Sequence, residues 1–202
     1  SAVPAFAFGY VLDMLSQPIA FVTHSRAVNK DDQMTTYQDH FAMMARYTIW
    51  ANNRLYDACA TLSDGARRQD RQVYFTSIHQ TLNHILIGDR IWASRFYGTP
   101  WTDYTLDAEL YADFDELRAA QMAETEKLLS WLTTYEDPDF SSAFAYQTAA
   151  GGQYETRYVL GLTHAFNHGT HHRGQVHAMI TQAGGTGPDL DLIFYDRDKM
   201  SD

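Results

Sequence analysis

The sequence THAFNHGTHHRGQ occupies residues 163–175 and holds four of the nine histidines of this 202-residue chain. On an α-helix of about 3.6 residues per turn, His164, His168 and His172 lie on one face at steps of roughly 6 Å. Because a metal–nitrogen bond is about 2.1 Å long, one ion can take two imidazoles that are one turn apart, but not all three. The stretch therefore predicts a helix that supplies two ligands to a metal ion.

His168 belongs to every pair that the spacing allows. The pairs are His164 with His168, His168 with His172, and His168 with His171. At about 100° per residue, Gln175 falls within a quarter turn of His168, whereas Arg173 and His177 point away. A third ligand must come from another helix.

An earlier helical segment, over residues 76–96, contains the best candidate for that ligand. His84 shares its face of the helix with small or apolar residues, while His79 and Asp89 lie about 140° away on opposite sides. His84 is therefore the histidine that we expect to face the later motif. Gly88, one turn further on, is expected to leave open space beside it.

Apolar residues recur at helical spacing in four long segments. We expect helices over about residues 36–62, 76–96, 112–135 and 157–183, with a polar connection over 66–71. Two β-prone runs separated by Gly151-Gly152 favour a small β-hairpin before the last helix. The chain after Gly184-Gly185 is interpreted as an extended tail with apolar anchors. These features predict an all-α protein, an up-down four-helix bundle, whose interior is a usual place for a metal site.

The first 33 residues differ from the rest of the chain. The segment 5–17 is apolar with a single charge and could form a short helix that ends before Pro18. A signal peptide is not expected, since no basic region precedes the apolar part. We interpret residues 1–33 as an appendage and residues 34–202 as one bundle domain.

Composition excludes several classes of partner. A net charge of −10 and the lack of a lysine or arginine cluster argue against nucleic acid and anionic membranes. No apolar run is long enough to span a membrane. The single cysteine, Cys59, cannot form an internal disulfide and lies in a helical pattern, so we expect a buried residue and a reducing, cytoplasmic location. The sequence also lacks Glu-x-x-His and H-E-x-x-H pairs, a P-loop, and the G-x-G-x-x-G and G-x-S-x-G motifs.

Individual polar residues have alternative interpretations. Asn52 could line a pocket, although a hydrogen-bonded core amide is favoured, and Glu124 is interpreted as a solvated residue rather than a ligand. His79 and His177 are expected to be ordinary hydrogen-bonded histidines. Two imidazoles on one inner face are costly to bury unless something coordinates or bonds them, so a metal is favoured for the motif that contains His168.

The two histidine motifs, together with WANNRL at residues 50–55, resemble the DinB/YfiT-like family of metal-binding four-helix bundles. The likeness covers roughly residues 34–195 and implies a divalent ion, zinc or nickel, held by His84, His168 and His172. His164 and His171 would then be pocket residues around the ion. The resemblance also implies a homodimer.

Three imidazoles leave a coordination position for water or a small-molecule substrate. Relatives in the family include thiol S-transferases and a thiol-dependent isomerase, so the resemblance implies a metal-dependent reaction of a low-molecular-weight thiol with an electrophile. Gln175 could orient the substrate or could be a simple helix-face amide. A metal-dependent hydrolase and a non-enzymatic, stress-associated metal-binding protein are the alternatives.

Overall fold

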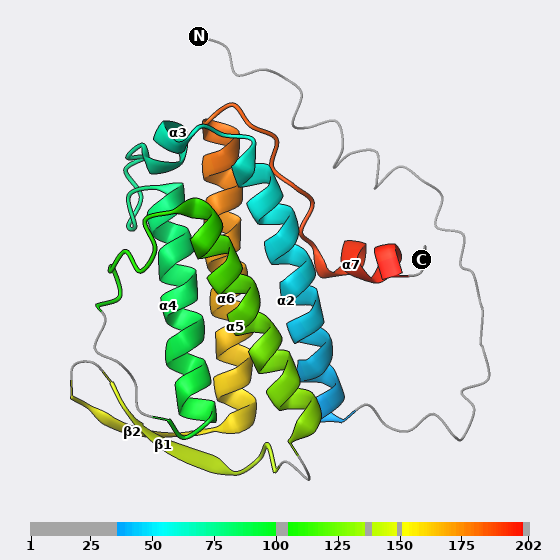
Figure 1. Ribbon diagram of the computed structural model, residues 1–202. Coiled ribbons are helices and arrows are strands. Elements are labelled where there is room, and N and C mark those ends of the chain that lie inside the picture. The colour runs from blue at the N-terminus through cyan, green and yellow to red at the C-terminus, as the bar shows by residue number, and fades with distance from the viewer. Residues whose placement is uncertain (1–35, 100–104, 136–138, 149–150, 200–202) are drawn as a thin grey trace, which may run out of the picture. The chain divides into compact units, whose positions relative to one another are not determined.

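The fold is built on four long helices. The protein's computed structural model describes residues 36–99, 105–135, 139–148 and 151–199. The long helices are α2 (Tyr37–Ala60), α4 (Ile78–Phe96), α5 (Phe114–Thr134) and α6 (Tyr158–Gln182). They lie side by side: α2 packs on α5 and α6, and α4 packs on the same two helices (Figure 1). The described part of the chain is thus mostly helical, as expected, and α4 and α6 are direct neighbours.

Side-chain caps determine where the long helices begin. Thr36 Oγ1 accepts from the Asp39 amide while the Asp39 carboxylate accepts from the Thr36 amide, which is a capping box at the start of α2. Ser77 caps α4, and Asp113 caps α5 by accepting two backbone N–H groups. These caps satisfy amides that have no partner within the helix. The observed helices begin and end within two residues of the expected bounds.

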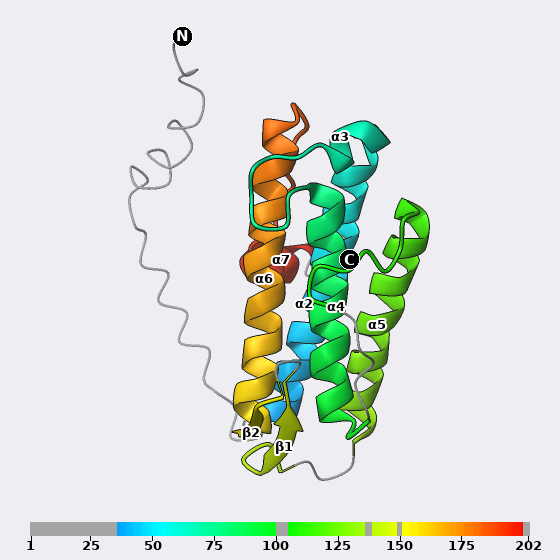
Figure 2. The same ribbon diagram turned by 90° about the vertical axis from the view of Figure 1, so that its left-hand side faces the viewer.

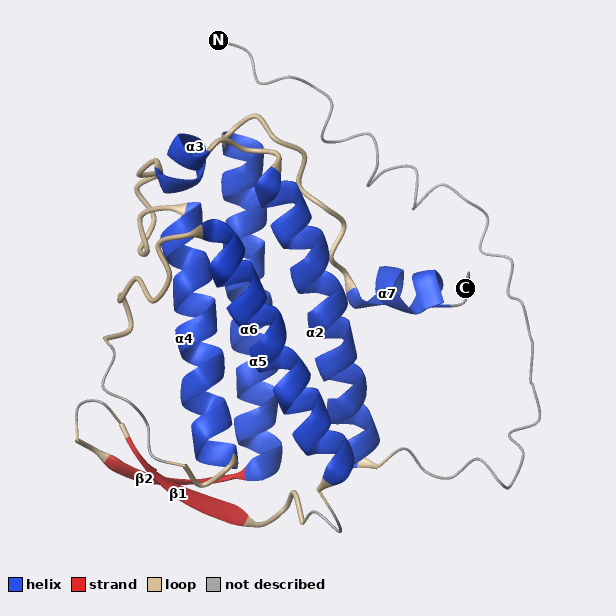
Figure 3. Ribbon diagram, in the orientation of Figure 1, coloured by secondary structure: helices blue, strands red, loops and turns tan. Residues whose placement is uncertain are grey.

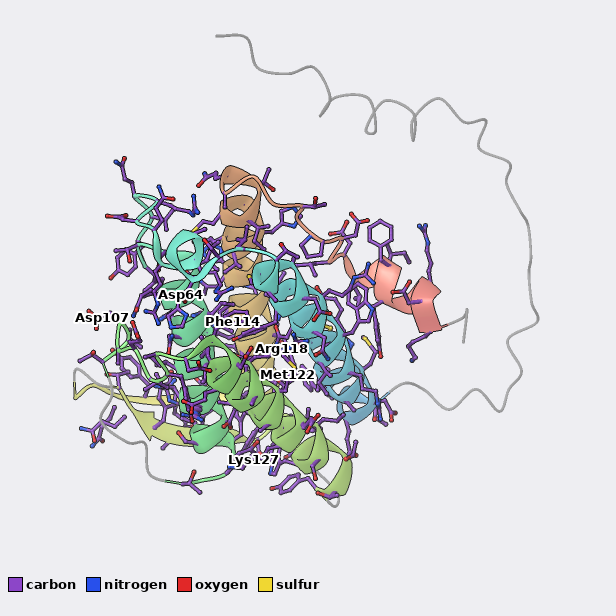
Figure 4. All side chains as sticks on the ribbon, turned by 45° about the horizontal axis from the view of Figure 1, so that its top comes forward. Asp64, Asp107, Phe114, Arg118, Met122 and Lys127 are labelled. Atoms are coloured by element: carbon purple, nitrogen blue, oxygen red, sulfur yellow. The ribbon has the colours of Figure 1, made fainter. Side chains whose placement is uncertain are left out.

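The core between the helices is apolar along most of its length. One cluster joins Leu55 of α2, Leu82 of α4 and Met179 of α6, all of them buried, and a second cluster is rich in phenylalanine. Cys59 is fully buried in the first cluster, and burial raises the pKa of its thiol to about 12. The thiol therefore stays protonated and is no nucleophile, in agreement with the sequence-based interpretation. Outside the core, Arg118 of α5, which Figure 4 labels, donates to Asp57 of α2 at 2.7 Å.

A β-hairpin precedes α6, as predicted. Strands β1 (Ala143–Gln147) and β2 (Gln153–Arg157) pair antiparallel, with Phe144 opposite Thr156 (Figure 3). The Phe144 ring is buried against Gly161 of α6, where an added Cβ would lie 3.1 Å from the ring. This contact holds the hairpin against the first turn of α6.

Two segments differ from the prediction. The tail is not extended throughout, because α7 (Leu192–Lys199) is helical and buries Tyr195 against Tyr47 and Trp50 of α2. The connection after α2 contains a short helix, α3 (Asp64–Arg68), which Ser63 caps. The turn signal that ends α2 therefore also starts the next helix.

None of the helices in the described ranges combines the length and apolar character needed to cross a bilayer. The short helix expected within residues 5–17 lies outside the described residues.

Candidate metal centre

Three predicted histidines converge between α4 and α6, which lie side by side in Figure 2. Each of His84, His168 and His172 offers a ring nitrogen, and these atoms lie within 4.8 Å of one another. The Nε2 atoms of His84 and His168 are 3.2 Å apart, and the centroids of the three rings are 4.4 to 5.1 Å apart. A metal ion that replaces the direct ring contacts could bond to all three nitrogens.

The rings meet because α4 and α6 run antiparallel. His84 faces His172, and one turn further along α4 Gly88 faces His168. A Cβ added to Gly88 would lie 2.6 Å from His168 Cε1, closer than real Cβ contacts allow. The expectation of open space beside Gly88 is therefore wrong, since the His168 ring fills it. The absence of a side chain at this position lets a ligand of α6 approach the backbone of α4.

Hydrogen bonds behind two of the rings select the tautomer that a metal needs. His84 Nδ1 lies 2.8 Å from the Leu106 carbonyl oxygen, so Nδ1 carries the proton and Nε2 keeps its lone pair. His172 Nδ1 donates to Gln175 Oε1 at 2.8 Å in the same way. The Gln175 amide nitrogen lies 3.1 Å from His171 Nε2. Gln175 and His171 therefore support His172 from behind.

Phe75 covers one end of the site. It belongs to the connection between α3 and α4, is buried, and stacks on the His84 ring at a centroid distance of 3.7 Å and an interplanar angle of 20°. Its ring also meets the His172 ring at 5.6 Å. Phe75 and the Leu106 carbonyl were not identified from the sequence, because both lie in connections that have no periodic pattern.

The environment keeps the three imidazoles neutral. Burial lowers the pKa of His84 and of His172. It also lowers the pKa of His168, to about 3, with a further contribution from the neighbouring histidines. The neutral ring is the form that coordinates a metal, so the site needs little or no proton release on binding near neutral pH. Three imidazole nitrogens form a donor set that suits a first-row divalent ion.

The other predicted pocket residues are more scattered. His164 is exposed, with its ring 4.7 Å from Trp92 and 6.0 Å from His168. Asn52 of α2 is buried, and its Nδ2 has no hydrogen-bond partner among the described residues, contrary to the expected satisfied amide. No hydrogen bond within the described ranges links Asn52 to the three central histidines. His79, in contrast, is the buried, hydrogen-bonded histidine that was expected, with Nε2 2.9 Å from the Tyr111 carbonyl oxygen.

A second polar cluster lies between α4, α5 and α6. Asp89 accepts from Gln121 at 2.7 Å and shares a cavity of about 20 Å³ with the buried Arg173 and with Glu124. Burial raises the pKa of Asp89 to about 6, although Gln121 and Arg173 both oppose that shift. Glu124 pairs with Arg90 at 3.5 Å and its side chain is only 14% exposed, so its interpretation as a solvated residue is wrong.

Comparison with known proteins identifies the family. The model of the DinB family matches residues 34–200. The chain belongs to the DinB family. A curated relative, Protein DinB of Bacillus subtilis (strain 168), is 28% identical over 155 residues, which cover 74% of this chain and 89% of the relative.

A DinB-like protein from Bacillus cereus ATCC 10987 has a similar solved structure, with a TM-score of 0.61 and 19% sequence identity. The match covers 76% of this chain and 99% of that one. At this identity the likeness shows that the two DinB proteins share a fold.

Proposed function

We propose that this DinB protein is a metal-dependent enzyme of the thiol S-transferase type, with His84, His168 and His172 as the ligands of a divalent ion. The observation that supports the proposal most strongly is the convergence of three neutral imidazoles within 4.8 Å. We further propose that the four long helices form an up-down four-helix bundle of the DinB/YfiT-like type and that the ion is zinc or nickel. When bound, such an ion lowers the pKa of a thiol or water ligand and leaves at least one position for it.

The protein's own groups would orient the ligands and exclude water. The Leu106 carbonyl and Gln175 hold the outer nitrogens of His84 and His172, so that the inner nitrogens stay directed at one point. Phe75 shields the His84 ring from solvent on one side. His164 lies beside His168 on the solvent side. Partial desolvation of its ring and the nearby Arg95 charge lower its pKa, so the ring is neutral and would be able to accept the proton that a thiol releases when it binds the ion.

The proposal also covers the oligomeric state, the location, the substrate class and the domain organisation of the protein. By resemblance to the family we propose a homodimer in the cytoplasm that acts on a small-molecule substrate and does not bind nucleic acid. The net charge of −10 supports the last point. We propose that residues 1–33 are an appendage to a domain that spans residues 34–202.

Thiol conjugation by the metal-loaded protein tests the proposal. A panel of low-molecular-weight thiols would be incubated with monochlorobimane, and fluorescence of the conjugate would be followed with and without zinc or nickel. We expect metal-dependent turnover that His168→Ala abolishes and His177→Ala retains, because His177 packs against Gly187 instead of facing the site.

Two outcomes would contradict the proposal in different ways. Hydrolysis of an ester or amide panel, without conjugation of any thiol, would favour a metal-dependent hydrolase. Stoichiometric metal with neither reaction would favour a non-enzymatic, stress-associated metal-binding protein.

A further inference from the structure

A series of side chains leads from the three histidines towards the C-terminal end of α4. The His164 ring lies 6.0 Å from the His168 ring and 4.7 Å from the Trp92 ring. The Arg95 guanidinium carbon lies 4.5 Å from the centroid of Trp92 and 4.2 Å from that of Tyr146 in β1. A cationic group is thus connected to the candidate metal site by three successive short contacts.

We propose that Arg95 is the anion-binding residue of this site and binds a carboxylate of the thiol substrate, an inference that rests on the proposed function. Two aromatic rings contact the guanidinium, and such contacts involve its planar faces. Its N–H donors lie at the edges of the plane, in a fork that matches a carboxylate. The rings would therefore hold the group in place without using those donors.

Among the described residues, Arg95 combines the lack of an acidic partner with contacts to two aromatic rings. Arg46, Arg157 and Lys127 also lack an acidic partner there, but none of them contacts two rings. Within the described ranges the Arg95 guanidinium makes no ion pair and no hydrogen bond, whereas Arg54, Arg68, Arg90 and Arg118 each contact a carboxylate. The chain carries 25 acidic and 15 basic residues, so internal partners are plentiful. Its side chain is partly buried, which strengthens a charge-assisted contact relative to one in open water.

The geometry also indicates which substrate would reach Arg95. The thiol sulfur would be fixed at the metal, so the remainder of the molecule must extend away from it. Phe75 closes the site beside His84 and His172. The opposite direction leads past the exposed His164 and the partly buried Trp92 to Arg95. Side chains of a helix lean towards its N-terminus, which brings the guanidinium over Trp92 and nearer to the histidines.

Binding of thiols to the cobalt-loaded protein tests this inference without turnover. Co²⁺ would replace the native ion, and thiolate-to-cobalt charge-transfer absorption would report the affinity for glutathione, which carries carboxylates, and for neutral 2-mercaptoethanol. We expect Arg95→Gln to weaken glutathione binding at least tenfold, which corresponds to about 1.4 kcal/mol. Affinity for 2-mercaptoethanol should stay unchanged, which would also show that the variant is folded.

Arg54→Gln is the matched control. It removes one positive charge from an exposed ion pair with Asp198 and should leave both affinities unchanged. Equal glutathione affinity in wild type and Arg95→Gln, or the same loss in Arg54→Gln, would overturn the assignment of Arg95 while leaving the proposed transferase intact. Binding of glutathione that depends on Arg95, without conjugation of any electrophile, would support the assignment and contradict the proposed function instead.

Discussion

Replacement of Gly88 by alanine tests whether close contact between α4 and α6 is needed for metal binding. The new Cβ would lie 2.6 Å from His168 Cε1 and 3.0 Å from His168 Nδ1. Ordinary contact begins at 3.4 Å, so the ring must move by about 0.8 Å. Metal–ligand distances in proteins are held to about 0.2 Å, so the imidazole cannot keep its place as a ligand.

The displacement of the His168 ring sets the expected loss of metal affinity. We expect Gly88→Ala to weaken metal binding by roughly 10- to 100-fold, the range seen when the support of a ligand is removed. Alanine stabilises a helix interior by about 1 kcal/mol relative to glycine, which offsets part of the cost of overpacking. The metal-free variant should therefore remain folded, with a free energy of unfolding close to that of wild type.

The assay is a zinc titration in competition with a chromophoric chelator, accompanied by denaturant unfolding of the metal-free proteins. Gly174→Ala is the matched control, because Gly174 lies in α6 two residues after His172 and an added Cβ there meets nothing within 4 Å. That variant should bind zinc like wild type. A folded Gly88→Ala variant with wild-type zinc affinity would refute the reasoning.

Two further variants separate the support of the site from the stability of the core. Gln175→Ala removes the acceptor of the His172 Nδ1 proton and should weaken zinc binding by about 10- to 100-fold, measured by the same competition titration; an unchanged affinity would show that the hydrogen bond does not support the ligand. Burial raises the pKa of Asp89 from 3.8 to about 6, so the folded state binds this proton more tightly than the unfolded state, and Asp89 costs stability increasingly as the pH rises from about 4 to 6. Across that pH window, the free energy of unfolding of Asp89→Asn, measured by denaturant titration, should therefore rise by up to about 3 kcal/mol relative to that of wild type. If the unfolding free energies of the two proteins changed with pH in parallel, the raised pKa of Asp89 would be contradicted.

Features that depend on local spacing could be predicted from the sequence. The step of four residues between His168 and His172 places both rings on one helix face whatever surrounds them. The helical pattern also predicted which face of its helix His84 occupies, and the structure places the His84 ring beside the rings of His168 and His172. The glycine pair at 151 and 152 likewise indicated the hairpin.

Features that depend on how distant segments pack could not be predicted. The contact between Gly88 and His168 requires the relative register of α4 and α6, which neither helix specifies alone. Burial of Asp89 and Glu124 results from packing around a shared cavity, whereas each is an ordinary charged residue on its own helical wheel. The apolar residues of α7 are consecutive and are not spaced by three or four, a pattern that favours an extended segment. The segment is nevertheless helical, and Tyr195 is its buried residue.

Metal content measured by mass spectrometry tests the central claim most directly. Untagged wild type and the variants His84→Ala, His168→Ala and His177→Ala would be loaded with zinc or nickel, desalted and analysed, with helicity followed by circular dichroism. We predict close to one ion per chain in wild type and in His177→Ala. The His84 and His168 variants should lose the ion while keeping their helicity. Unchanged metal content in the folded His84→Ala and His168→Ala proteins would contradict the proposed metal centre.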